Sequence, residues 1–164
     1  MASGDQLAAA EEVVRAGMYP YWDHQLNRGT PSAFTQKEVS VSRLSVLGLA
    51  EIVSIMQREF DARVHPAGES MAVRGTGIAS VQQVVQQAQV PMEDNSLPNV
   101  VLTVVEKPMP GNPAHAEICG WDRHTPDQAR KIPRGIAKRL VDLFIWAPLA
   151  VPPAEVFDEA DGAS

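Results

Sequence analysis

The chain has 164 residues, a formal net charge of −6 and a single cysteine, Cys119. This length fits one globular domain with one core, and a lone cysteine excludes an intrachain disulfide and a cysteine-rich zinc module. The N-terminus has no basic segment ahead of an apolar run, and no stretch reaches the roughly 18 apolar residues of a membrane span. We therefore expect a cytoplasmic protein that does not contact a membrane.

The first predicted element is a short helix followed by a long loop. Ser3 and Gln6 have the spacing of a capping box, and the Ala- and Val-rich stretch after them predicts a helix to about Ala16, ended by Gly17. Residues 18–34 hold several aromatic side chains and two prolines, so we expect an irregular loop that either packs on the core or contacts a protein partner. The predicted contact residues are Tyr19, Tyr21 and Trp22.

A strand and the main core helix are predicted next. Residues 38–41 favour a short strand, and Ser42 is placed to cap an amphipathic helix from Arg43 to about Phe60. The segment SMAVRGTGI favours a second short strand that ends in a turn made by its glycines, because Arg74-Gly-Thr-Gly is too short for a phosphate-binding loop.

A glutamine-rich helix is predicted after Ser80, which has the position of its N-cap. In VQQVVQQAQ the valines share one face and the glutamines cover the other. A face of neutral amides is ordinarily solvated; the alternative is a contact surface for another copy of the chain. On that alternative the contact residues are Gln82 and Gln86.

Two strands and a last helix are predicted in the remaining chain. NVVLTVVE is apolar on both faces, which predicts a strand that is central in a sheet covered on both sides, or one covered on one side and flanked by a partner. A short Pro/Gly-rich turn joins it to a second strand, AHAEICGW, as an antiparallel pair. Thr125 before Pro126 has the pattern of a helix start. After an interruption at Pro133 and Gly135, that helix is expected to continue to about Trp146.

These elements predict an α+β fold: a single domain over residues 1–147, with a small mixed or antiparallel sheet packed by helices. The Pro- and acid-rich residues 148–164 are expected to form a flexible, disordered tail.

The strand AHAEICGW carries the main candidate for chemistry. Because alternate strand residues face the same side, His115 and Glu117 project together with Cys119. A carboxylate beside an imidazole suits a general base or a metal ligand, but a solvent-facing strand with these residues looks the same. His-Ala-Glu begins the zinc deaminase pattern, whose second half needs thiolates that the chain lacks, so no metal and no cofactor are expected.

Three short motifs carry a resemblance: Arg28-Gly-Thr-Pro-Ser-Ala-Phe, Val39-Ser-Val and Asn112-Pro-Ala-His-Ala. Over roughly residues 25–145 the chain resembles a family of small bacterial proteins that has no assigned activity. The resemblance implies that several residues belong to one site, which would hold an anionic group. These residues are Arg28, Ser32, Phe34, Ser40 and His115.

Two functions remain open from the sequence. The first is an accessory protein that binds a protein partner; the resemblance suggests a defence-type operon. The second is an enzyme or sensor for a phosphate-containing ligand such as a nucleotide or RNA, with Arg28 holding the anion, His115 as acid or base and Glu117 orienting it. Six basic residues between Trp121 and Arg139 could bind nucleic acid, although a solvated helix face is the simpler interpretation.

Overall fold

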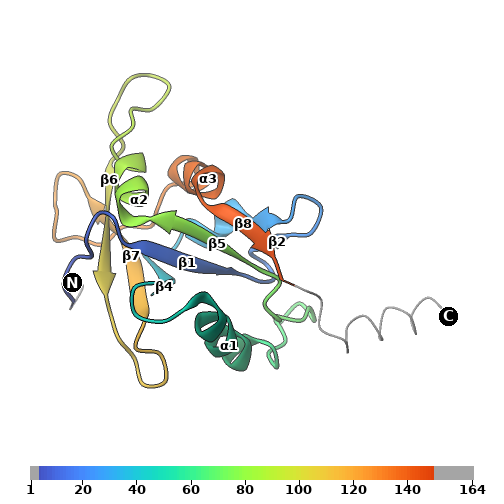
Figure 1. Ribbon diagram of the computed structural model, residues 1–164. Helices are drawn as coiled ribbons and strands as arrows, with labels where there is room; N and C mark the ends of the chain where they lie inside the picture. Colours follow the sequence, from blue (N-terminus) through green and yellow to red (C-terminus); the bar gives the residue numbers. More distant parts are fainter. Residues whose placement is uncertain (1–3, 150–164) are drawn as a thin grey trace.

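The protein is described by a computed structural model over residues 4–149. Its strands are β1 (Glu12–Gly17), β2 (Trp22–Asp23), β3 (Arg28–Gly29), β4 (Glu38–Arg43), β5 (Gly75–Ser80), β6 (Val100–Glu106), β7 (His115–Asp122) and β8 (Ile145–Pro148). Its helices are α1 (Leu49–Phe60), α2 (Val81–Gln87) and α3 (Arg134–Leu143), with a 3-10 turn, η1 (Pro31–Phe34). Six strands form one antiparallel sheet in the order β6-β7-β4-β1-β5-β8, and β2 pairs separately with β3 (Figure 1).

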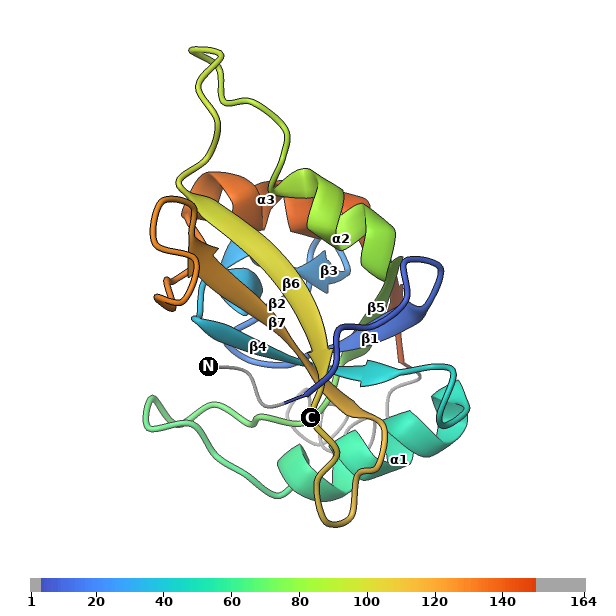
Figure 2. The same cartoon turned by 90° about the vertical axis from the view of Figure 1, so that its left-hand side faces the viewer.

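The sheet lies between two unequal layers. Figure 2 shows α2 and α3 on one side of the sheet and α1 on the other. The larger core lies under α2 and α3, where alternate strand residues such as Val39, Val41 and Ile118 are buried. The smaller core joins α1 to β1 and β5 through Val14 and Ile52, among others. The α+β class and the single domain are confirmed, while residues 150–164 of the predicted tail lie outside the described chain.

The glutamine-rich helix forms as predicted because both ends of its capping box are made. The Ser80 side chain accepts a hydrogen bond from the Gln83 backbone N–H, and the Gln83 side chain accepts one from the Ser80 N–H. Val81 and Val84 are buried against the larger core. The antiparallel pairing of β6 with β7 is likewise confirmed, from Val100 opposite Asp122 to Glu106 opposite Ala116.

The predicted N-terminal helix is wrong, because residues 12–17 form strand β1. This strand pairs along its whole length with β5, and Val13 and Val14 are buried on opposite faces of the sheet. Burial on both faces suits a strand inside a sheet better than a short helix with one apolar stripe. Long-range pairing therefore outweighs the local helix preference of the preceding alanines.

The core helix begins later than predicted. Ser42 and Arg43 belong to strand β4, and Gly48 occupies the N-cap position of α1. Only Ile52 and Met56 of this helix are buried, although its apolar stripe is wide. The strand is extended because Ser42 pairs with residues on both neighbouring strands, Val14 of β1 and His115 of β7.

The glycines of SMAVRGTGI lie in strand β5 rather than in a turn. A side chain at Gly75 would overlap the Trp22 ring, and one at Gly77 would overlap the Trp146 ring. The glycines therefore let two indole rings lie directly on the strand, 6.1 Å apart between centroids. This close approach, not turn geometry, accounts for both residues.

Three further predictions are wrong in the C-terminal half. Thr125 begins a turn, whose backbone N–H donates to the Asp122 carboxylate, and α3 starts only at Arg134. The chain leaves that helix at Phe144 and forms β8, an extra edge strand. Strand β6 lies at the end of the sheet order instead of its centre, with residues 5–7 bonded along its outer side.

Candidate functional site

One half of a sheet face is polar and is not covered by a helix. Strands β4 and β7 pair so that Ser40 lies opposite Glu117 and Ser42 opposite His115. The residues between them, such as Val41 and Ala116, point into the larger core. Because α1 packs on β1 and β5, the polar residues of β4 and β7 are left beside an open space.

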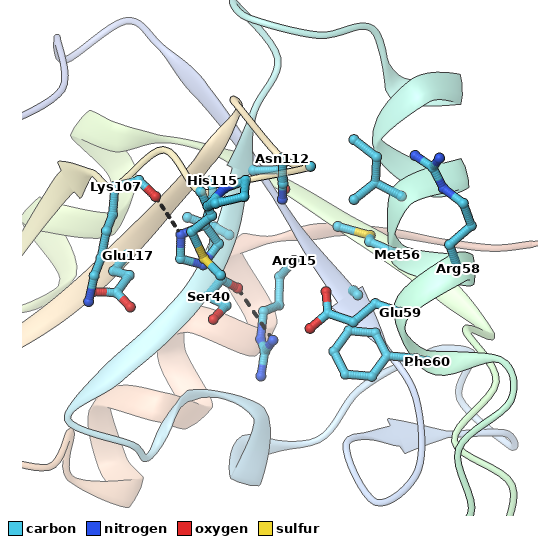
Figure 3. A pocket seen from close by; sticks show the side chains of 17 residues that line it. Arg15, Ser40, Met56, Arg58, Glu59, Phe60, Lys107, Asn112, His115 and Glu117 are labelled. Atoms are coloured by element: carbon cyan, nitrogen blue, oxygen red, sulfur yellow. Dashed lines mark hydrogen bonds and ion pairs between the residues drawn. The ribbon is translucent and has the colours of Figure 1, made fainter.

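This space is a cavity of about 750 Å³ with walls from two separate segments. Figure 3 shows Met56, Glu59 and Phe60 of α1 on one side and the strand residues on the other. The loop between β6 and β7 supplies further lining residues, including Asn112. A cavity of this size, with apolar walls and a few converging polar groups, is the usual form of a small-molecule site.

His115 is held in one orientation by the backbone. Its Nδ1 lies 2.9 Å from the carbonyl oxygen of Lys107, and the residue is only 9 % exposed. Since a carbonyl oxygen can only accept, Nδ1 must carry the proton of this bond. In the neutral ring Nε2 is then left with its lone pair, which is the arrangement of a hydrogen-bond acceptor or a general base.

Glu117 is bound to Lys107, not to His115. The Lys107 Nζ lies 3.2 Å from the Glu117 carboxylate and 3.9 Å from that of Glu38. The hydrogen bond from Lys107 to Glu117 raises the pKa of the lysine, so the lysine stays a cation near neutral pH. The predicted orienting role of Glu117 is therefore filled by the Lys107 carbonyl.

Arg15 is the charged group that the sequence interpretation missed. Strands β1 and β4 pair only at Val13 and Val14, and the Arg15 guanidinium lies where they separate. It donates to the Ala33 carbonyl at 3.0 and 3.2 Å and to the Ser40 carbonyl at 3.3 Å. The residue is more than nine-tenths buried and lines the cavity.

The Arg15 charge has no acidic partner among residues 4–149. Burial lowers the pKa of the guanidinium to about 10, which still leaves it a cation at neutral pH. Its carbonyl partners and the Tyr21 ring, 5.5 Å away, are dipolar groups without a full negative charge. A buried cation of this kind is stabilised further when an anion reaches its remaining N–H groups.

The cysteine and serine side chains of β4 and β7 are not arranged as nucleophiles beside His115. Burial raises the pKa of the Cys119 thiol to about 11, so that the thiolate is scarce at neutral pH. Ser40 and Ser42 line the cavity, but neither hydroxyl takes part in a hydrogen bond with His115 in the described chain. In the described chain, therefore, His115 has no serine or cysteine side chain as a hydrogen-bond partner.

The predicted ligand site is divided by the sheet. Ser40, His115 and Glu117 line the cavity together, whereas Arg28 and Ser32 do not. Arg28 forms an ion pair with Asp142 of α3, on the side of the larger core. The core therefore separates Arg28 from His115, and Arg15 is the arginine that lines the cavity with His115.

The aromatic loop is largely committed to packing. Trp22 is buried against Gly17 and Gly75, and Tyr21 packs on the larger core. Tyr19 is half-buried and meets the His65 ring edge-on, with centroids 5.0 Å apart. By contrast, the glutamines of α2 that were predicted as contact residues are exposed. These are Gln82 and Gln86.

Half of the basic residues near the C-terminal helix have structural roles. Arg130 pairs with Asp122 at 2.8 Å, while Arg123 and Arg139 donate to backbone carbonyls of the segment that follows α2. Three basic side chains remain exposed around α3, which is a small patch for nucleic acid. They are Lys131, Arg134 and Lys138.

Within residues 4–149 no cluster of three or more His, Cys, Asp or Glu side chains is placed to hold a metal ion. No helix in the same part of the chain is long and apolar enough to cross a membrane. The fold and site together define an α+β protein with an open cavity on one half of an antiparallel sheet. Comparison of the chain with models of protein families, with curated proteins and with solved structures gives no match.

Proposed function

We propose that the protein binds a small molecule carrying an anionic group in the cavity between α1 and the polar half of the sheet. One observation carries this proposal: a buried guanidinium without an acidic partner and a histidine with an open Nε2 line the same cavity. Arg15 supplies charge and two-pronged hydrogen bonding to the anion. His115 accepts a hydrogen bond from a hydroxyl or amine of the same ligand.

An enzymatic reaction in this cavity would use the same nitrogen atom of His115, Nε2. The Lys107 carbonyl holds His115 in the tautomer in which Nε2 takes a proton from a ligand or a bound water. A sensor would use the same contacts without turnover. Both alternatives depend on the Arg15 contact, which is therefore tested first.

The test compares two arginines. The full chain is screened by thermal shift against acetate, benzoate, inorganic phosphate and adenosine monophosphate, and any stabilising compound is titrated by calorimetry. We expect Arg15→Met to weaken binding by about 30-fold or more, because a buried charge contact is lost. The matched variant Arg28→Met, which removes an arginine outside the cavity, should leave the affinity unchanged.

Arg15 also holds two segments of the chain together, so Arg15→Met affects the stability of the fold as well as ligand binding. A second variant separates these two effects. Arg15→Lys keeps the charge but not the two-pronged geometry, and should bind the anion more weakly than the wild type but better than Arg15→Met. If a stabilising anion binds equally well to wild-type protein and to both Arg15 variants, the cavity is not its site and the proposal is overturned.

A second candidate function is contact with a protein partner, including another copy of the chain. The observation that favours it is the exposed glutamine face of α2 beside the protruding segment 88–99, where Val90 and Leu97 are exposed (Figure 1). If that face joins two copies, light scattering after size exclusion will show a dimer at high protein concentration. The double variant Gln82→Arg and Gln86→Arg will then be monomeric. A wild-type monomer at every concentration rules out self-association here.

A further inference from the structure

We infer that the ligand is an amphipathic organic acid with a single negative charge, held at Arg15 and packed by its apolar body against Met56, Phe60 and Met109. This inference rests on the proposed function and adds the chemical class of the ligand. It has two independent supports, the charge balance of the cavity and the character of its walls.

The charges that line the cavity nearly cancel. They comprise three cations, Arg15, Arg58 and Lys107, and two carboxylates, Glu59 and Glu117. Lys107 is already occupied by Glu117 at 3.2 Å. One excess positive charge suits a carboxylate or a phosphodiester, each of which carries a single charge at neutral pH. A phosphate monoester carries about −1.5 to −2 and would leave negative charge facing the two glutamates.

The walls opposite the strands carry several apolar side chains beside the charged Arg58 and Glu59. Ile55, Met56 and Phe60 come from one side of α1, and Met109 and Pro110 come from the loop between β6 and β7. Figure 3 shows Met56 and Phe60 on the side of the cavity opposite His115, with Arg15 between. Methionine and phenylalanine side chains adapt to flat or aliphatic groups, and burying apolar surface adds affinity in proportion to area.

The two supports lie at different places in the cavity. The anion contact is at the split between β1 and β4, whereas the apolar contacts are on α1 and on residues 107–112. A small inorganic ion at Arg15 would make no contact with the cavity-facing atoms of Met56, Phe60 and Met109. A neutral apolar compound would leave the guanidinium without an anionic partner. A ligand with an anionic group and an apolar body makes both kinds of contact.

Four probes separate these contributions in calorimetric titrations of the full chain. 2-Naphthoate combines an apolar naphthalene ring system with one negative charge. Acetate carries the charge without the rings, and 2-naphthol carries the rings without the charge. 2-Naphthyl phosphate carries the rings with a higher negative charge. We expect 2-naphthoate to bind at least about tenfold more tightly than each of the other three.

Substitution in the loop tests the apolar wall without disturbing the core. Met109 lines the cavity and is 48 % exposed, while Leu97 is 52 % exposed on the segment before β6 and outside the cavity. Met109→Ser should weaken 2-naphthoate about fivefold and leave acetate unchanged. Leu97→Ser, the matched control, should alter neither.

The outcomes distinguish this inference from the proposed function. Equal affinities for acetate and 2-naphthoate, or an unchanged affinity in Met109→Ser, overturn the apolar part and leave anion binding intact. If 2-naphthyl phosphate binds more tightly than 2-naphthoate, the inference that the ligand carries a single charge is overturned. Equal binding of 2-naphthol and 2-naphthoate would instead remove the anion contact, and with it the proposed function. Failure of all four probes to bind at millimolar concentration overturns the inference as well.

Discussion

Two arginines of the sheet are stabilised in contrasting ways. Arg43 of β4 is tied to the carboxylates of Glu11 and Glu106, with Nη2 at 3.2 Å from Glu11 and Nη1 at 3.1 Å from Glu106. Arg15 of β1 is buried more deeply and has only carbonyl oxygens and an aromatic ring around it. The first arrangement strengthens the fold and the second leaves charge available, which is why we place the ligand at Arg15.

The Glu11 contact makes stability depend on pH. Its hydrogen bond from Arg43 holds the pKa of Glu11 below the usual 4.5, so the ionised carboxylate stabilises the folded state above the unfolded pKa. That contribution is lost as the pH falls through the lower, folded pKa. We expect Glu11→Gln to lower the free energy of unfolding by about 2 kcal/mol at pH 7.

Urea unfolding at a series of pH values checks this prediction. The difference between wild type and Glu11→Gln should start to shrink below about pH 4.5 and disappear below the folded pKa of Glu11, where both proteins carry a neutral group at position 11. Glu12→Gln, at the exposed neighbouring position, is the control and should change little. A wild type and variant that keep the same difference from pH 7 to pH 3 would contradict the role of Glu11.

At the scale of the element, the glycines of strand β5 make room for the aromatic rings that pack on it. The Trp146 ring occupies the space beside Gly77, and it also stacks near Phe144 with centroids 5.8 Å apart. Its indole N–H donates to the Val141 carbonyl at 2.8 Å. The edge strand β8 is therefore attached through an aromatic side chain as well as through its ladder with β5.

Gly77→Ala tests this attachment. A methyl group at position 77 would lie 2.6 Å from two carbon atoms of the Trp146 ring, so the ring must move. We expect a loss of about 3 kcal/mol in the free energy of unfolding, measured in denaturant. Gly48→Ala is the matched control, since its added methyl group would meet nothing closer than 3.9 Å.

Introducing Gly77→Ala into a Trp146→Ala protein shows whether overlap with the ring causes the loss of stability. If ring overlap is responsible, adding Gly77→Ala to Trp146→Ala should cost much less than adding it to the wild type. An equal cost in both backgrounds would point to the backbone of β5 instead of the ring.

Elements with strong local signals were predictable, and those set by pairing were not. The Ser80 capping box and the β-branched run of β6 specify their structures within a few residues. Strands β1 and β8 overlap the ends of segments that the sequence predicts as helices, and they become strands because β5 pairs with both of them. Thr125 had the sequence of a helix start, but the Asp122 carboxylate binds the backbone there as a turn.

At the scale of the whole molecule, the candidate site depends on register. The alternation in β7 placed His115 and Glu117 on one face, and the structure adds Ser40 and Ser42 opposite them. Arg15 could not be predicted, because its position depends on where β1 and β4 separate. Its only sequence signal was a lone arginine among Val and Ala residues in EVVRAG. The grouping of Arg28 with His115 failed because the core lies between them.

The floor and the walls of the cavity differ in how much they contribute to the core. The floor belongs to strands whose other side forms the larger core, so a substitution there affects both the cavity and the packing of the fold. The walls come from α1 and from residues 107–112, which contribute little to that core. Substitutions in α1 or in residues 107–112 can therefore change the shape and charge of the cavity, while the sheet that positions Arg15 and His115 is left intact.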